Sequence, residues 1–278
     1  MSTEFRIERL SEADVGANVA LAQSVGWLDT ESDWRVLHGA ALVLGVRQNG
    51  RLIGQGALGL YGNAGTVAKM IVAPDFQRQR LGSSILNALL LEAEQRSIAV
   101  LGLVATPLGR PLYEHTGFTA AGEVAVLTGT PTPMNSTSHA APLANSGLAV
   151  CVDERWLSCA RAPMLHARFR ENIATASCSD PDGNIQGYAM ATEQGPQAVV
   201  GPVMAGSEAD ARLLASSIFR AVNRPIRIDV PVQQRDFRKW LQGIGLHEQG
   251  IRVEMARGAS QLPWQVPQRY ALATQAWG

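Results

Sequence analysis

The stretch from residue 72 to residue 93, VAPDFQRQRLGSSILNALLLEA, joins an apolar segment to an amphipathic one through a short polar loop. The apolar side leads through Val72 to Pro74 and is typical of a strand. After Gly82, apolar residues recur with helical spacing and would lie on one face of a helix: Ile85, Leu86, Leu89, Leu90 and Ala93. The pattern predicts a strand that ends near Val72 and a helix that begins near Leu81.

A helix that begins in this way offers a site for an anion. The first backbone N–H groups of a helix have no partner within it, and the helix dipole adds partial positive charge. We expect the amides of Arg78 through Ser83 to converge on a volume that suits a diphosphate. Gly82 would let a ligand approach the backbone, and Arg78 and Arg80 would add charge. A plain turn with solvated arginines and a packing glycine explains the same residues.

Outward from this loop, the first half alternates strands and helices. Strands are predicted at 5–10, around an Asn49-Gly50 hairpin turn, at 98–106 and at 121–129. Helices are predicted after Ser11, over about 80–97 and, as a short one, over 109–117. We expect Glu31 and Asp33 to lie in a loop around Trp27 and Trp34, after the first of these helices.

A similar order returns after residues 129–146, which are rich in Pro, Ser, Thr and Asn. There we predict helices at 153–169, 207–222 and 235–245, and strands at 187–192, 198–205, 225–232 and 251–258. The prediction is an α/β (α+β) protein with two copies of one unit. Its domains would be 1–130 and 147–278, joined by a linker at 131–146.

Composition excludes several classes of function. The chain of 278 residues has 24 basic and 24 acidic residues, so no overall charge favours nucleic acid or an anionic membrane. No apolar run is long enough to span a membrane and the N-terminus is not signal-like, so we expect a cytoplasmic protein. The five histidines are scattered, and the three cysteines have no C-x-x-C spacing, so no metal site is expected.

The loop itself resembles the acyl-CoA-binding motif of the GNAT N-acetyltransferase superfamily, Q/R-x-x-G-x-G/A, read here as Gln77-Arg78-Gln79-Arg80-Leu81-Gly82. The resemblance implies that residues 77–83, ending at Ser83, bind the diphosphate of acetyl-CoA, the co-substrate. It also implies a mixed, mostly antiparallel twisted sheet flanked by helices in each domain. Arg80 departs from the motif, because a glycine is usual there.

A second segment, PLYEHTGF at 111–118, resembles the superfamily's L-Y-x-x-x-G-F context. By that resemblance Tyr113 would donate a proton to the departing thiolate of CoA. The backbone of Met70, Ile71 and Val72 would hold the pantetheine arm as an added strand. A tyrosine that packs on the sheet is the structural alternative.

Further segments in both halves resemble two-domain bacterial members of the superfamily, in which the second domain is degenerate. The second half has no counterpart of the CoA loop, and Glu208 and Asp210 would repel a diphosphate there. We therefore expect one CoA site, in the first domain.

The resemblance implies direct transfer of an acetyl group to an amine, and a capped cleft would favour a small molecule. Candidate acceptor residues are Trp27, Glu31, Asp33 and Asp229, and either Glu31 or Asp33 could act as the general base. The alternatives are a solvated loop carboxylate for Glu31 and Asp33, and a helix cap or turn for Asp229. Trp34 and Trp240 could also wall the acceptor pocket, although isolated tryptophans are more often core residues. The alternatives are a non-catalytic acyl-CoA sensor and a protein N-acetyltransferase. A monomer and a homodimer are both compatible with the sequence.

Overall fold

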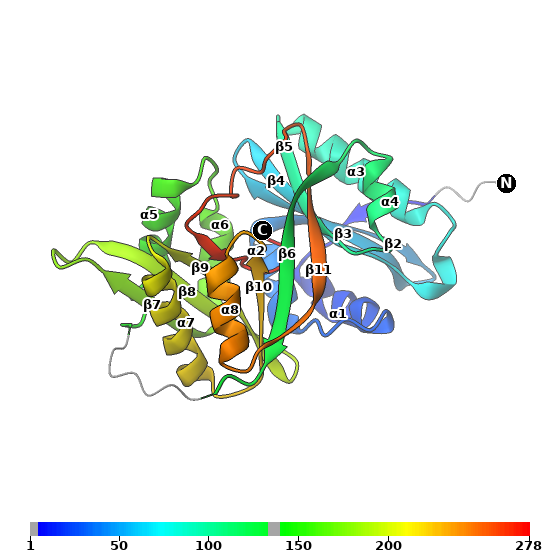
Figure 1. The fold of residues 1–278 in the computed structure, drawn as a ribbon. Coiled ribbons are helices and arrows are strands. Elements are labelled where there is room, and N and C mark those ends of the chain that lie inside the picture. The colour runs from blue at the N-terminus through cyan, green and yellow to red at the C-terminus, as the bar shows by residue number, and fades with distance from the viewer. Residues whose placement is uncertain (1–4, 133–139) are drawn as a thin grey trace.

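The computed structural model describes residues 5–132 and 140–278. Their strands form a single 12-stranded sheet in the order β1-β2-β3-β4-β5-β11-β6-β10-β9-β8-β7, with β12 paired to β9 (Figure 1). Only the pairs β4–β5 and β10–β9 are parallel. The predicted mixed, mostly antiparallel sheet flanked by helices is confirmed, but the sheets of the two halves are continuous.

The first half supplies one end of this sheet and the helices on both its faces. Its strands are β1 (Ile7–Arg9), β2 (Ala41–Gln48), β3 (Arg51–Tyr61), β4 (Ala64–Val72), β5 (Val100–Ala105) and β6 (Thr119–Gly129). Its helices are α1 (Val15–Ser24), α2 (Glu31–Ala40), α3 (Leu81–Gln95) and α4 (Arg110–Glu114), with 3₁₀ turns η1 (Glu12–Asp14) and η2 (Pro74–Phe76).

The second half repeats this order. Helices α5 (Ser146–Trp156) and α6 (Ala162–Arg170) correspond to α1 and α2, and α7 (Glu208–Val222) and α8 (Arg235–Gly243) correspond to α3 and α4. The strands are β7 (Asn172–Ser179), β8 (Ile185–Gln194), β9 (Gln197–Ala205), β10 (Ile226–Pro231), β11 (His247–Arg257) and β12 (Arg269–Ala271). The order of elements in the two halves agrees with the predicted duplication of one α/β unit.

The two halves exchange their last long strands. Strand β11 of the second half pairs with β5, and strand β6 of the first half pairs with β10. The exchanged strands pair with each other at the middle of the sheet, where they run side by side in Figure 1. Each half therefore completes the sheet of the other.

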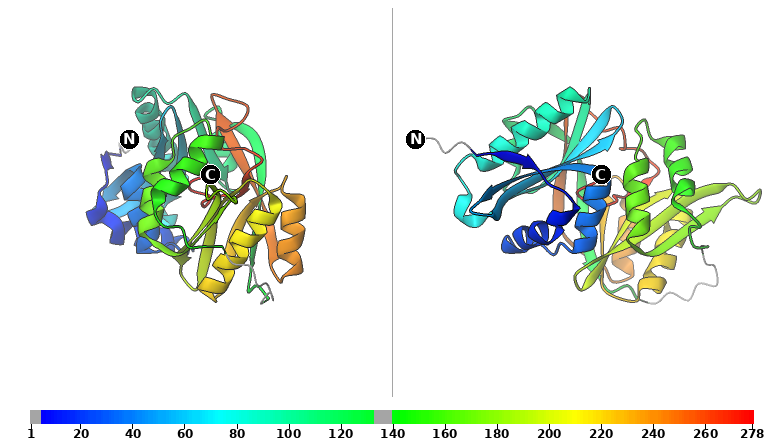
Figure 2. Two further views of the ribbon diagram at one scale, coloured as in Figure 1. Left: turned by 90° about the vertical axis from the view of Figure 1, so that its left-hand side faces the viewer. Right: turned by 180° about the vertical axis from the view of Figure 1, so that it is seen from behind.

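The segment after β11 returns to the junction of the halves, so that residue 278 lies near the middle of the molecule (Figure 2). Trp264 packs where a side chain on Gly102 of β5 would stand, and Trp277 packs over Gly59 of β3. The hydroxyl of Tyr61 donates to the backbone oxygen of Trp277 at 2.7 Å. These contacts tie the last residues of the chain to the first half of the sheet.

Two predicted elements are wrong. The helix expected at 153–169 is two helices, because the chain leaves α5 after Trp156 and starts α6 with Pro163 in its first turn. Glu31, Asp33 and Trp34, expected in a loop, lie in helix α2, which begins with a capping box between Thr30 and Asp33.

The predicted linker lies partly outside the described residues, which omit 133–139. The predicted division into domains 1–130 and 147–278 stays a prediction, and the exchange of β6 and β11 means that each unit draws a strand from beyond its boundary. In the described part of the chain, no helix is both long and apolar enough to cross a membrane.

Candidate active site

Strands β4 and β5 part within the sheet and leave an opening. They pair in parallel only at Ala64–Val100, Gly65–Leu101 and Thr66–Gly102. Beyond this point β4 continues to Val72 and contains a bulge, where Gly56 of β3 stands opposite residues 69 and 70. The edge of β4 that faces β5 is therefore left for another extended segment, along the predicted residues Met70, Ile71 and Val72.

The loop after β4 presents unpaired amides at the end of this opening. Helix α3 begins at Leu81, as predicted, and its first hydrogen bond runs from Ser84 N to Arg80 O. Within the described residues, the N–H groups of Arg78 through Ser83 have no hydrogen-bond partner. Arg78 and Arg80 both have left-handed backbone, with φ of 61° and 64°. Alternating left-handed residues turn successive amides toward one point, which suits an anion.

The two glutamines of the loop hold its shape. Gln77 Nε2 donates to Val72 O and Gln79 Nε2 donates to Asp75 O, at 3.2 and 3.0 Å. The N–H of Gln77 donates to Pro74 O, so this predicted diphosphate contact is already engaged within the loop. Arg78 and Arg80 are exposed and form no ion pair with any described residue.

Gly82 marks where three segments meet. A Cβ atom added there would lie 3.6 Å from Val72 Cγ2 and 3.8 Å from Leu112 Cδ2. The end of β4, the start of α3 and helix α4 are thus in contact around one backbone position. A side chain on Gly82 would extend from the helix start, where a ligand would approach the free amides.

Tyr113 lies on α4 beside this junction. Its side chain packs edge-on to Phe118 at a centroid distance of 6.0 Å, and its hydroxyl lies near Gly109. Burial raises the pKa of Tyr113 to about 12, so the phenol keeps its proton at neutral pH. The residue is 8% exposed, and its hydroxyl forms no hydrogen bond within the described chain.

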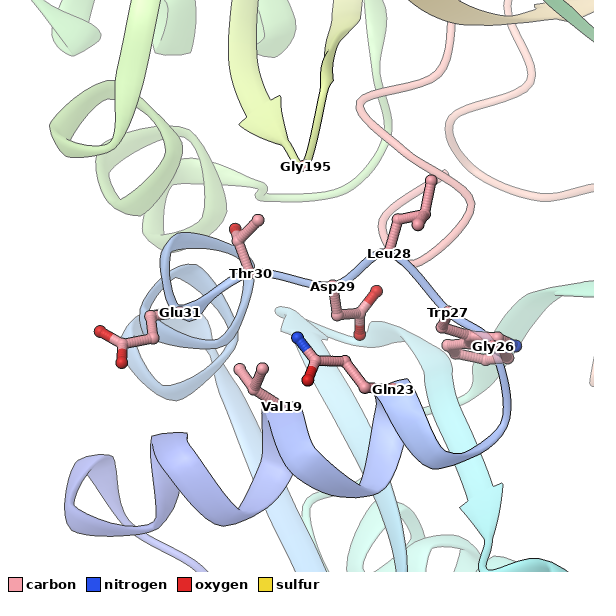
Figure 3. A pocket seen from close by; sticks show the side chains of 9 residues that line it. All are labelled: Val19, Gln23, Gly26, Trp27, Leu28, Asp29, Thr30, Glu31 and Gly195. Carbon is pink, nitrogen blue, oxygen red and sulfur yellow. The ribbon is translucent and has the colours of Figure 1, made fainter.

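An open cleft of about 620 Å³ lies between the two halves, beside the α1–α2 loop. Figure 3 shows its lining, which comes from α1, the loop and the β8–β9 turn: Val19, Gln23, Gly26, Trp27, Leu28, Asp29, Thr30, Glu31 and Gly195. Two of these residues are acids, and none is basic. The cleft has the volume of a small-molecule site.

A buried ion pair connects the cleft to the bulge of β4. Lys69 Nζ lies 2.6 Å from Asp29 Oδ1, and these side chains are 11% and 3% exposed. The ammonium also stands over the rings of Trp27 and Trp34, at 5.4 and 6.0 Å from their centroids. This pair was not predicted from the sequence. A lysine inside the apolar run AGTVAKMIV was the available signal.

Only some of the predicted acceptor residues line the cleft. Trp27 and Glu31 line the cleft, and Glu31 pairs with Arg35. Asp33 accepts hydrogen bonds from Thr30 in the capping box, and burial raises its pKa against the opposing charge of Lys69. Asp229 does not line the cleft. It is 1% exposed within β10 and accepts two hydrogen bonds from Arg227, so its charge is already compensated.

The other two tryptophans named from the sequence, Trp34 and Trp240, do not line the cleft. Trp34 is fully buried, and Trp240 stacks on Phe219 and Phe237 in the second half. The thiols also have no nucleophilic setting: burial raises the pKa of Cys159 and of Cys178 to about 11, and Cys151 is exposed outside the cleft.

The corresponding opening in the second half is filled by the chain itself. Strands β9 and β10 pair in parallel at 198–200 with 226–228 and then separate, as β4 and β5 do. Strand β12 pairs with β9 beyond that point, and Leu272 N donates to Asp229 O of β10 at 2.9 Å. The start of α7 is capped by Ser207 and carries Glu208 and Asp210. Neither the slot nor the helix start is free for an acyl-CoA.

Comparison with known families and proteins agrees with this geometry. Two family models, each described as an acetyltransferase (GNAT) domain, match residues 28–137 and 149–271. The chain is 24% identical over 282 residues to the uncharacterized N-acetyltransferase YitH of Bacillus subtilis (strain 168), covering 97% of both chains.

Solved structures show the same fold. A putative acetyltransferase from Pyrococcus horikoshii superposes with a TM-score of 0.85 at 17% identity, over 99% of this chain and 96% of that one. A tandem GNAT protein from the clavulanic acid biosynthesis pathway superposes with a TM-score of 0.66 at 16% identity, over 91% and 98%. With a GNAT model matched in each half, the chain belongs to the GNAT acetyltransferase superfamily and is an acyltransferase with tandem domains.

Proposed function

We propose that the protein moves an acetyl group from acetyl-CoA directly to the amine of a small molecule. The observation that carries the proposal is the meeting of the β4–β5 opening with the unpaired amides of Arg78 through Ser83. An extended arm that ends in a diphosphate matches both parts at once. The second half lacks both parts, so we propose one site per chain.

Each step of the transfer has a candidate group. The amides at the start of α3 would bind the two phosphates, with Arg78 and Arg80 contributing charge. A strand amide near Ile71 or Val72 would polarise the thioester carbonyl. The amine nitrogen would then bond to the carbonyl carbon as the C–S bond breaks, and Tyr113 would give its proton to the departing sulfur. The proton that the nitrogen loses would pass through water and restore the phenol of Tyr113. With a pKa of about 12, Tyr113 is protonated at neutral pH, as a proton donor must be.

The shape of the cleft supports a small acceptor. The loop that carries Leu28 contacts the β8–β9 turn: a Cβ atom on Gly195 would lie 3.9 Å from Leu28 Cβ. The second half therefore closes one side of the cleft, where a peptide chain would need an open groove. The acids among the lining residues favour an amine over an anionic acceptor.

Arg80 gives little support to the alternative of a degraded, sensor-like site. Its backbone adopts the left-handed conformation that a glycine would adopt, and its side chain is exposed. The loop thus keeps a shape compatible with binding despite the substitution.

The test is calorimetric titration with acetyl-CoA, NAD and ATP, followed by a thiol-release assay against a library of amines. We expect binding of acetyl-CoA alone and thiol release with at least one small amine. Gly82→Glu, which adds a carboxylate beside the free amides, should weaken acetyl-CoA binding at least tenfold. Gly243→Glu adds the same group to the end of α8, where no described residue lies within 4 Å of the new Cβ, and serves as the matched control. Equal affinity of the two variants would refute the proposed site.

A further inference from the structure

Asp29 occupies a position that the proposed transfer does not yet explain. It is the one carboxylate of the described cleft lining that is buried, and in Figure 3 its side chain points from the α1–α2 loop into the space beside Gln23 and Trp27. Glu31, the other acid of the lining, is exposed. A buried carboxylate at the wall of a cleft needs a physical reason, because taking a charge out of water is costly.

Only half of that carboxylate is compensated. Oδ1 receives the ammonium of Lys69, whereas Oδ2 is buried without a hydrogen-bond partner among the described residues. A buried acceptor left without a donor costs about 1 to 3 kcal/mol. Such an atom at a cleft wall is where a ligand donor compensates the loss.

Lys69 shows a second sign of a built site. Its backbone has φ of 53°, a left-handed conformation that a side chain disfavours, and it sits at the bulge of β4. Non-glycine residues keep such strained backbone where the surroundings impose it, commonly at ligand sites. The bulge directs Lys69 to Asp29, while Ile71, two residues later, borders the slot proposed for the thioester.

On the basis of the proposed function, we propose that Asp29 is the residue that binds the acceptor amine. Oδ2 accepts an N–H of a small primary amine, Lys69 fixes the carboxylate through Oδ1, and the body of the acceptor packs on Trp27. The nearby Lys69 charge disfavours a second ammonium in the same space. The Asp29 charge favours the ammonium form and the Lys69 charge opposes it, so the neutral amine that transfer requires stays accessible.

The test measures amine binding without turnover. Tyramine, histamine and putrescine are titrated calorimetrically into protein saturated with CoA, which has no acetyl group to transfer. We expect at least one of these probes to bind, and Asp29→Asn to weaken that binding at least tenfold. The amide keeps the shape of the side chain but loses its charge. Any probe that the thiol-release assay also finds active should show a raised KM for the amine in Asp29→Asn, with the KM for acetyl-CoA unchanged.

A second variant distinguishes the loss of a binding group from misfolding. Asp29→Asn combined with Lys69→Gln removes both charges, so that no buried lysine is left unpaired, and it should also lose amine binding. Asp236→Asn is the matched control, since it breaks an exposed Asp–Lys pair on α8 and should change nothing. Titration with acetyl-CoA reports separately on the proposed function and on folding. The inference is overturned if no probe binds the parent protein, or if the probes bind Asp29→Asn as tightly.

Discussion

Met255 of β11 lies directly opposite Leu103 of β5, so a strand from the second half forms part of the sheet next to the proposed acetyl-CoA slot. The other edge of β11 pairs with β6, which in turn pairs with β10. The first half has no direct pairing between its own β5 and β6. The sheet of one half is thus closed only by the chain of the other.

This exchange predicts that neither half folds alone. A fragment of residues 1–132 would leave the edge of β5 unpaired and β6 with no partner, and their free backbone N–H and C=O groups would promote aggregation. We expect it to aggregate or to lack a cooperative thermal transition by circular dichroism. Co-expression with residues 133–278 should restore a soluble complex of both pieces. A cooperative transition in the isolated fragment would contradict the importance of the exchange.

Removing the hydroxyl of Tyr113 should impair chemistry and spare binding. Tyr113→Phe should lower kcat at least tenfold in the thiol-release assay, because the leaving sulfur loses its proton donor. Acetyl-CoA affinity should stay within twofold by calorimetry. The required form of this residue is the phenol, which persists below its pKa of about 12, so Tyr113 should cause no decline in kcat between pH 7 and pH 10. Unchanged kcat in the variant would exclude the role.

The left-handed backbone of Arg80 predicts a difference between two small replacements. Arg80→Gly should exceed Arg80→Ala in free energy of unfolding by about 0.5 to 1 kcal/mol, because only glycine adopts this conformation without strain. Both variants lose the same charge, so both should bind acetyl-CoA more weakly and with less dependence on salt. Chemical denaturation and titration at two salt concentrations measure these effects. Equal stabilities would mean that the loop relaxes.

A buried ion pair in the second half should be important for stability. Asp153 receives Arg161 Nε at 2.8 Å and the hydroxyl of Tyr188 at 2.7 Å, and all three side chains are buried. Asp153→Asn leaves the arginine charge uncompensated and should lower the free energy of unfolding by about 3 kcal/mol. The exposed Asp236→Asn should change it by less than about 0.5 kcal/mol. If Asp153→Asn lowers the free energy of unfolding by no more than Asp236→Asn does, the buried ion pair is not important for stability.

The carboxylate of Asp14 should give a pH-dependent contribution. The backbone N–H of Ser11 and the guanidinium of Arg47 hold the pKa of Asp14 below its ordinary value of 3.8. A lowered folded pKa means that the stabilisation is complete above the unfolded pKa and is lost as pH falls through the folded one. The stability gap between wild type and Asp14→Asn should therefore be constant from pH 7 to pH 5. It should narrow below pH 3.8, as followed by urea denaturation, and a gap unchanged at low pH would refute the shift.

Local patterns predicted the elements whose signals lie in adjacent residues. The strand end at Val72 and the helix start at Leu81 follow from composition and spacing, and the Asn49-Gly50 turn has positive φ at both positions. Helix α2 was not predicted, although Thr30 and Asp33 form its capping box, because Glu31 and Asp33 were placed in a loop around Trp27 and Trp34.

The features that the sequence did not predict depend on contacts between residues far apart in the chain. Nothing in the alternating pattern of β6 or β11 specifies which half it joins, since either slot offers the same backbone groups. Asp29 and Lys69 meet only because the bulge of β4 turns the lysine toward the α1–α2 loop. Asp229 was predicted to face the cleft, but it pairs with Arg227, two residues before it on the same strand face.

The short strand β12 should prevent inhibitors built on the pantetheine scaffold from binding between β9 and β10. Its residues occupy the second slot as part of the same polymer, and a tethered occupant acts at an effective concentration on the order of millimolar. A diffusing compound would have to displace β12 against that effective concentration. It would also have to break the backbone hydrogen bond from Leu272 N to Asp229 O. Such compounds should saturate the protein at one equivalent per chain.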